Sequence, residues 1–148
     1  AYEISLGLVG SEMCIRDRSR GTQLERIEFD LDDEYARRYL GVVNGCSPSV
    51  EENGIPPHGM ATRAVLALLE SLSLPAGTVH VSQSVTSHAK ANVGAVFSML
   101  TTVTQTRAVR GYLHVSLNFD ISDEFNEGRL IIQGDTVVMV PLGLDRGI

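Results

Sequence analysis

The chain has 148 residues, a mass of 16.0 kDa and a hydrophobic content of 43%, which suits one globular domain and is too apolar for a disordered chain. The formal net charge is −6, so the basic surface needed to bind a nucleic-acid backbone is missing, and charges interrupt every apolar stretch that might span a membrane. Two cysteines, Cys14 and Cys46, make neither a disulfide framework nor a CxxC metal site. We expect a cytoplasmic domain without metal or cofactor, and with neither nucleic acid nor membrane as partner.

The first 18 residues, AYEISLGLVGSEMCIRDR, differ in character from the rest of the chain. Their apolar stretch, residues 4–9, has no clear helical or strand period, and it lacks the basic start and small-residue cleavage site of a signal peptide. The run LVGSEMCIRDR resembles translated sequencing-adapter read-through. We therefore expect residues 1–18 to be an artefactual, disordered leader and residues 19–148 to form the single domain.

The next segment predicts a strand followed by a helix. LERIEFDL (24–31) alternates apolar and polar residues, as a half-buried strand does. DDEYARRYLGVVN (32–44) predicts a helix with Asp32 as N-cap and acidic residues in the first turn. Its apolar residues at helical spacing are Tyr35, Tyr39, Val42 and Val43.

A long loop and a second helix follow. Residues 45–57, GCSPSVEENGIPP, are rich in Gly, Pro, Ser and Asn, and long ordered loops of this kind are often functional. MATRAVLALLESLSL (60–74) predicts the strongest helix of the chain. A stripe of Met60, Ala64, Leu68 and Leu72 is widened by Val65, Leu66 and Leu69, which indicates a helix buried on most sides.

The remaining chain predicts four strands. Residues 78–85, 95–106, 111–121 and 129–142 have period-two or β-branched patterns, joined by turns at 107–111 and 123–128. The first of them alternates Val79, Val81, Gln83 and Val85 against polar residues. Gly134, inside the last strand, suggests a bulge or bend. Together with the long apolar helix, these strands predict an α+β fold of the hot-dog type, in which a curved antiparallel sheet wraps around one buried helix. An exposed edge strand of such a sheet commonly pairs across a dimer.

Several segments resemble the MaoC-like hot-dog family, which includes (R)-specific enoyl-CoA hydratases and related acyl-CoA dehydratases. They are IPPHGM (55–60), LPAGTVHVSQSV (74–85), ANVGAVF (91–97) and the tail RLIIQGDTVVMVP. The resemblance covers roughly residues 24–141. It implies an acyl-CoA-type thioester as ligand, hydration or dehydration of 2-enoyl and 3-hydroxyacyl thioesters as the reaction, and a homodimer or heterodimer formed through the sheets.

The start of the long helix is the expected binding site. A helix amino terminus presents unpaired N–H groups and a partial positive charge, and glycine allows a close approach to the backbone. We expect a thioester carbonyl on the N–H of Gly59, with Pro57, Met60, Gln83 and His88 as further substrate-binding residues. The structural alternative is that Gly59 only lets the loop enter the helix.

This chain lacks the acid/base pair that the resemblance to the family would imply. The hydratases carry Asp-x-Asn-Pro-x-His in the preceding loop, whereas this chain has GCSPSV, with Gly45 at the Asp position and Val50 at the His position. Neither residue can carry a proton, so a catalytically silent subunit that dimerises or binds acyl groups is an alternative. His58, beside the expected carbonyl site, is the candidate catalytic base.

Other candidates are weaker. Hot-dog thioesterases place an acid about nine positions after the helix-start histidine, which here is Ala67, while Glu70 lies a turn later and is expected to face solvent. A thioesterase is therefore a third hypothesis. Cys46 would need a nearby base to act as a nucleophile. Two further histidines, His80 and His114, are expected on solvated strand faces.

Overall fold

The computed structural model describes residues 15, 18–44, 55–72 and 74–143. Within them the elements run β1 (Ile27–Asp30), α2 (Asp33–Asn44), α4 (Pro57–Leu72), β2 (Val79–Ser87), β3 (Val96–Val109), β4 (Tyr112–Asp123), the 3-10 turn η1 (Glu124–Asn126) and β5 (Arg129–Pro141). The order of helices and strands is the one that the sequence predicts. The first strand is shorter than expected, because Leu24 joins β3 only through its N–H, which donates to the Thr101 carbonyl at 2.8 Å.

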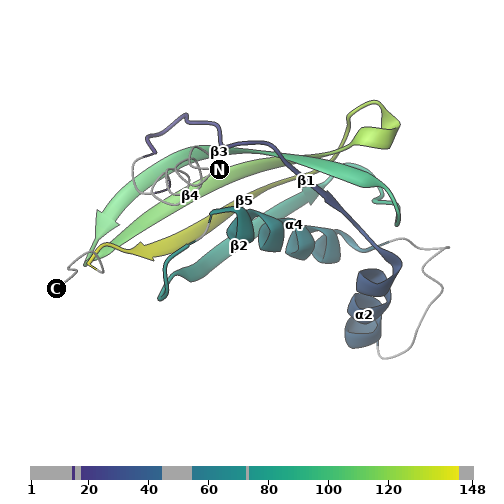
Figure 1. Ribbon diagram of the computed structural model, residues 1–148, viewed down its shortest axis with the longest axis horizontal. Helices are drawn as coiled ribbons and strands as arrows, with labels where there is room; N and C mark the ends of the chain where they lie inside the picture. Colours follow the sequence, from purple (N-terminus) through teal and green to yellow (C-terminus); the bar gives the residue numbers. More distant parts are fainter. Residues whose placement is uncertain (1–14, 16–17, 45–54, 73, 144–148) are drawn as a thin grey trace, which may run out of the picture.

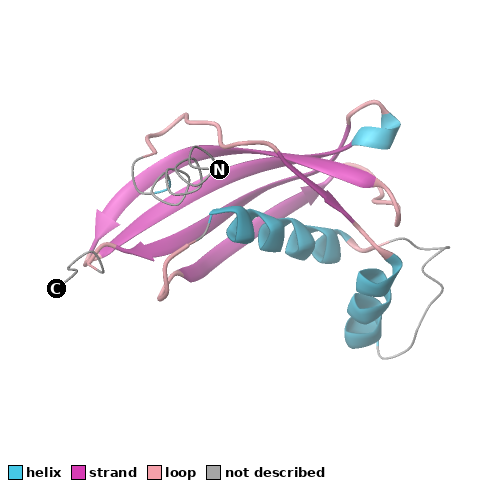
Figure 2. Cartoon of the chain, in the orientation of Figure 1, coloured by secondary structure: helices cyan, strands magenta, loops and turns pink. Residues whose placement is uncertain are grey.

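The strands form one antiparallel sheet in the order β1-β3-β4-β5-β2. The sheet curves over α4, which lies along its concave face, and α2 follows the end of β1, beyond the sheet (Figure 1). Strands dominate the described chain, as Figure 2 shows. The predicted α+β architecture, a curved sheet around one long helix, is confirmed. No helix in the described part of the chain is long and apolar enough to cross a membrane.

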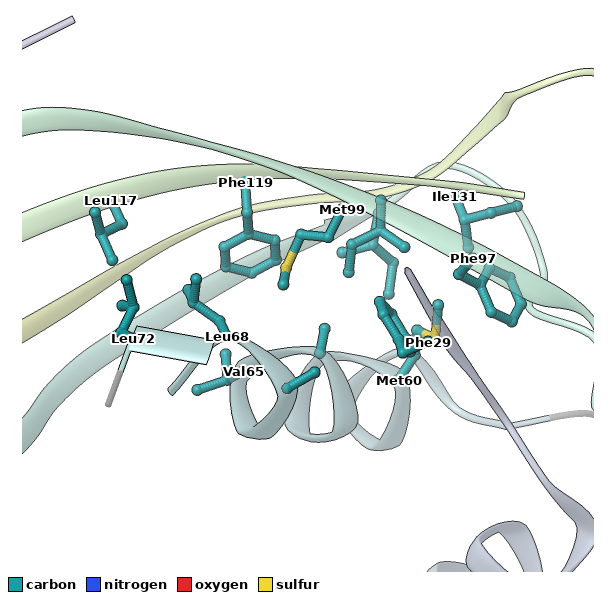
Figure 3. Close-up of a cluster of buried hydrophobic side chains, with 14 of the residues drawn as sticks. Phe29, Met60, Val65, Leu68, Leu72, Phe97, Met99, Leu117, Phe119 and Ile131 are labelled. Carbon is teal, nitrogen blue, oxygen red and sulfur yellow. The ribbon is translucent and has the colours of Figure 1, made fainter. Parts of the chain in front are cut away.

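The core lies between α4 and the sheet. The predicted stripe of α4 is buried, with Met60, Ala64 and Leu68 at 0% exposure. Figure 3 shows Val65, Leu68 and Leu72 pointing from α4 toward Phe119 and Leu117 of β4. One expectation for this helix is wrong, since Leu66 is 48% exposed: the sheet covers only one side of the helix.

The α2 helix begins as predicted but buries a different face. The Tyr35 N–H donates to Asp32 Oδ1 at 2.7 Å, which confirms the N-cap. Val42 and Val43, expected on the packed face, are 86% and 56% exposed. The buried positions are Ala36 and Leu40, because only the amino-terminal part of α2 and one narrow face meet the rest of the domain.

Gly134 has a different role from the one expected. The register of β5 with both neighbours is continuous through Gly134, and the shift between β4 and β5 falls between Ile121 and Ser122. A Cβ on Gly134 would come within 2.5 Å of Phe119 Cζ and of the Ser84 carbonyl oxygen. The glycine is therefore required for close packing rather than for a bulge.

The alternation expected for β2 is also interrupted. The register of β2 against β5 shifts between His80 and Ser82, so Val79 and Val81 do not continue the face on which Gln83 lies. All but one of the strand's residues are exposed. β2 therefore forms an open edge of the sheet, as the sequence predicts for this fold.

Of the expected leader, residues 1–14, 16 and 17 lie outside the described residues. Ile15 is described, and its side chain is 1% exposed within the hydrophobic core. The core thus includes one residue of a segment that the sequence analysis sets aside.

Candidate functional site

The amino end of α4 is built from two prolines and a glycine. Pro57 occupies the first helical position, where the missing N–H of proline costs nothing. The Pro56 carbonyl accepts from the N–H of Gly59 at 3.0 Å and from that of Met60 at 3.2 Å. A substrate carbonyl on the Gly59 N–H would therefore have to share that donor with Pro56.

Gly59 is also the point at which α2 meets α4. A Cβ on this residue would lie 2.8 Å from Tyr39 Cε1, so only glycine admits the ring at this distance. The Tyr35 hydroxyl donates to the Gly59 carbonyl at 2.8 Å. These contacts support a structural role for Gly59, which is to let α2 pack closely against α4. Its role in binding substrate stays a prediction.

Tyr35 is a residue that the sequence analysis did not assign to the site. Burial raises the pKa of its phenol, and the nearby Tyr39 raises it further, while the Arg63 guanidinium acts in the opposite direction. The hydroxyl therefore stays protonated through the neutral range and holds the Gly59 carbonyl as a donor. The available signal was the pair of tyrosines one helical turn apart.

A pocket of about 310 Å³ adjoins this helix end. An isolated bridge between Ile55 and Ala91 brings the chain before α4 alongside the chain after β2. The lining is largely apolar with one cation: Ile55, Pro56, Pro57, Ser87, Ala89, Lys90, Ala91 and Ile132. Lys90 is the only lysine of the chain. We call this cavity the amino-end pocket; it offers an apolar wall and a positive charge beside the first turn of α4.

The predicted residues of the helix start lie together but differ in access. Pro57 lines the amino-end pocket, and His58 is exposed on the first turn, where its carbonyl accepts from the Thr62 hydroxyl at 2.8 Å. Met60 is 0% exposed within the core. Contact between Met60 and a ligand would require the core to open, whereas Pro57 and His58 are accessible.

The other two predicted substrate residues lie elsewhere. Gln83 is exposed in the middle of β2, opposite Thr136. His88 Nε2 lies 2.9 Å from Gln133 Oε1, whose amide in turn donates to Asp120 Oδ1 at 3.0 Å. Asp120 alternates with buried β4 residues, so this chain of hydrogen bonds runs across the convex face, away from α4.

The loop expected to carry the acid/base pair, with Gly45, Cys46 and Val50, lies outside the described residues. Among the residues that the structure describes, the lining of the amino-end pocket contains neither a carboxylate nor an imidazole. Glu70 is exposed, as predicted, and lines none of the described pockets.

A second pocket, of about 370 Å³, lies at the other end of α4; we call it the carboxyl-end pocket. Its lining is Leu69, Leu74, Pro75, Ala76, Gly77, Thr78, His80 and Val138. His80 Nε2 lies 2.9 Å from the hydroxyl of Thr136, a residue that is 0% exposed. The imidazole is exposed, as expected, but it lies on the α4 side of the sheet and is held by a partner 56 positions away in sequence.

Comparison with known proteins gives a match in structure only. No family model and no curated protein matches the sequence. An (R)-hydratase from A. caviae involved in PHA biosynthesis has a TM-score of 0.67 at 16% identity, over 85% of this chain and 99% of that one. A MaoC-like dehydratase from Rhodospirillum rubrum has a TM-score of 0.69 at 13% identity, over 86% and 95%.

A (3R)-hydroxyacyl-ACP dehydratase complex from Mycobacterium tuberculosis has a TM-score of 0.63 at 19% identity, over 81% of this chain and 96% of that one. A Thermus thermophilus thioesterase superfamily member has a TM-score of 0.60 at 17% identity, over 84% and 85%. At these identities the likeness defines the fold alone. The chain therefore has the hot-dog fold of MaoC-like dehydratases and (R)-hydratases, as the sequence predicts.

Proposed function

We propose that the chain binds an acyl-CoA-type thioester at the amino end of α4 in the cytoplasm, and that it hydrates 2-enoyl or dehydrates 3-hydroxyacyl thioesters. The observation that carries this proposal is the first turn of α4, in which Pro57 lines the amino-end pocket and Gly59 follows two residues later. The helix end would stabilise the negative charge that develops on the thioester oxygen. The pocket would take the acyl group, and Lys90 would attract the phosphates of the carrier.

The pocket lining sets the size and character of the ligand. Most of its side chains are those of alanine, proline and isoleucine, an apolar lining that suits a short hydrocarbon chain. Its volume of about 310 Å³ is at the lower end of the range for ligand-binding pockets. The fold neighbours named as hydratases and dehydratases support the same class of substrate. Like the dehydratase from Mycobacterium tuberculosis, which is a complex, this chain would work as a dimer, with itself or with a related subunit.

Loss of crotonyl-CoA absorbance on hydration tests the activity. The wild type should consume the enoyl thioester, and Ala89→Phe, which fills the amino-end pocket, should reduce the rate at least tenfold. Ala108→Phe, the same change at an exposed β3 position, should leave the rate unchanged. An inert wild type, or equal rates for the two variants, would refute the proposed activity at this pocket.

A catalytically silent subunit is the second candidate, and the described part of the pocket lining, which holds no acid or imidazole, favours it. Such a protein would bind butyryl-CoA, as heat release on titration would show, yet leave crotonyl-CoA unchanged. A thioesterase would instead release free CoA, which a thiol reagent detects. Among the described residues Glu70 gives that third hypothesis no support, because its side chain is exposed and lines no described pocket.

A further inference from the structure

A third cavity, of about 520 Å³, opens on the convex face of the sheet, away from α4. Asp120 and Ser122 are β4 residues that alternate with buried ones, and they pair across the ladder with Leu100 and Ser98 of β3. The η1 turn that follows β4 contributes to the same cavity. The complete lining is Arg26, Ser98, Leu100, Asp120, Ser122, Glu124, Glu127, Gly128 and Leu130. We call this cavity the convex-face pocket.

The convex-face pocket is acidic. Asp120, Glu124 and Glu127 contribute carboxylates, and Arg26 is the only basic residue of the described lining. Arg26 Nη1 lies 3.7 Å from Glu124 Oε1 in an exposed ion pair, and no described basic residue pairs with Asp120 or Glu127. In the described part of the chain no group of acidic or histidine side chains converges closely enough to hold a metal ion. The pocket therefore suits a cation whose positive groups are spread along its length.

Two polar side chains on the strands have room for a ligand group. Asp120 Oδ1 accepts from the Gln133 amide at 3.0 Å, and His88 holds Gln133 in turn, so the carboxylate is fixed while its Oδ2 has no hydrogen bond among the described residues. Ser98 is 4% exposed, yet its hydroxyl also has no hydrogen-bond partner in the described structure. Buried hydroxyl groups in proteins normally have a partner. A ligand that donates hydrogen bonds would satisfy both oxygen atoms.

We propose that the convex-face pocket binds a linear aliphatic polyamine of the spermidine class. One terminal ammonium donates to Asp120 Oδ2 and to the Ser98 hydroxyl; these residues are diagonal neighbours of the ladder, roughly 7–8 Å apart. The other end of the ligand lies against Glu124 and Glu127. The inference is independent of the proposed function, because the pocket lies on the face of the sheet opposite to α4.

The spacing of the carboxylates selects the length of the ligand. Asp120 and Asp123, the last residue of β4, are roughly 10 Å apart at about 3.3 Å per residue, and Glu124 follows directly. A triamine reaches across this distance more fully than a diamine does. Leu100 and Leu130 give the methylene groups of the ligand an apolar surface. An anionic ligand is excluded, because the carboxylates outnumber the one arginine of the lining.

Calorimetric titration of the full chain with spermidine tests the proposal. The titration is run at about 0.15 M salt, where attraction to the net charge alone is screened. We expect spermidine to bind at one site, and the shorter diamine putrescine to bind about tenfold more weakly because it loses one charge-assisted contact. Mg²⁺ at the same concentration should give no heat of binding. No heat with spermidine, or equal affinity for spermidine and Mg²⁺, would overturn the proposal.

Matched substitutions place the binding site in the pocket. Asp120→Asn keeps an oxygen for the Gln133 amide and removes the charge, so it should weaken spermidine binding about tenfold. Ser98→Ala should weaken it about threefold. Asp135→Asn makes the same charge change at an exposed β5 residue outside the pocket, and should have no effect. Equal losses for Asp120→Asn and Asp135→Asn would show that spermidine responds to net charge, and would refute the site.

One substitution should strengthen binding. Arg26→Gln removes the cation that competes for Glu124, so spermidine should bind about threefold more tightly, which a variant that merely disturbs the fold would not do. Amide resonances of Ser98, Ser122 and Gly128 should shift during the titration, while that of Ala89 in the amino-end pocket should not. Weaker binding by Arg26→Gln, or shifts confined to other parts of the chain, would contradict the proposal.

Discussion

The two ends of α4 are built for different tasks. The amino end, where Gly59 lies against Tyr39, is tightly packed and opens onto a pocket with a lysine. The carboxyl end opens onto a pocket with an imidazole, His80, whose ring is held by the buried Thr136. Helix polarity favours an oxyanion at the first end and a cation at the second. Each end thus holds a chemical group that the other lacks, and the predictions below test this division.

The largest effect is expected at the packed end. Gly59→Ala puts a methyl group within 2.8 Å of the Tyr39 ring, so α2 must shift and the free energy of unfolding should fall by about 1–3 kcal/mol. Gly41→Ala is the matched control: its Cβ meets open space in α2, so it should raise stability by about 0.5–1 kcal/mol. Urea denaturation measures both. Equal changes would show that Gly59 is not in close contact with Tyr39.

The Tyr35 hydroxyl should stabilise the same junction in a pH-dependent way. Tyr35→Phe removes its hydrogen bond to the Gly59 carbonyl and should cost about 1 kcal/mol at neutral pH. Because burial raises the pKa of Tyr35 above the 10.0 of the unfolded chain, the folded protein binds this proton more tightly. Its contribution is therefore complete below pH 10 and is lost as the pH rises through the folded pKa.

Thermal unfolding between pH 8 and 11 checks this linkage. The wild type should lose more stability than Tyr35→Phe over the alkaline part of that range. Parallel curves for the two proteins would show that the phenol titrates as it does in the unfolded chain.

Two buried threonines should respond in opposite directions to the same change. At the carboxyl end, Thr136→Val removes the hydroxyl that binds both His80 and the Ser82 carbonyl, and should destabilise the fold by about 1 kcal/mol. Thr101, on β3, has a buried hydroxyl without a hydrogen-bond partner among the described residues. Thr101→Val should therefore raise stability by up to about 1 kcal/mol. Chemical denaturation measures the free energy of unfolding of both variants. If both substitutions raised it, or both lowered it, the hydrogen bonding described for the two threonines would be contradicted.

The smallest effect is expected from the charge at the amino-end pocket. Lys90→Gln should weaken butyryl-CoA binding by about threefold, since an exposed ion pair contributes well under 1 kcal/mol. Binding of butyryl-N-acetylcysteamine, which has no phosphate, should not change. Calorimetric titration measures the affinity of the wild type and of Lys90→Gln for each ligand. If the substitution also weakened binding of the ligand without phosphate, Lys90 would shape the pocket rather than attract phosphate.

Periodicity predicted the buried elements well and the exposed ones poorly. α4 and strands β3 to β5 have long apolar patterns, and the stripe from Met60 to Leu72 is buried as expected. In α2 the spacing of Val42 and Val43 predicted the wrong buried face. This helix lies beyond the edge of the sheet, so only one narrow face of it packs against the rest of the domain. The shift between His80 and Ser82 is set by pairing with β5 and leaves no signal in the β2 sequence alone.

Only those features of the candidate site that depend on residues close together in the sequence could be predicted. Pro57 and Gly59 are signals of a helix start, but α4 begins at Pro57, three residues before the start at Met60 that the sequence predicted. The contacts of Gly59 with Tyr35 and of His80 with Thr136 join residues 24 and 56 positions apart, and no local pattern connects them. The burial of Ile15 is equally non-local, and it was missed because the surrounding segment has no period.

A crystal structure of the protein with butyryl-CoA would test the central claim most directly. We predict the thioester carbonyl within hydrogen-bond distance of the Gly59 N–H, with the acyl chain against Ile55, Ala91 and Ile132 in the amino-end pocket. An acyl chain in the carboxyl-end pocket, beside Leu69 and Val138 of the same copy and away from Gly59, would contradict the account.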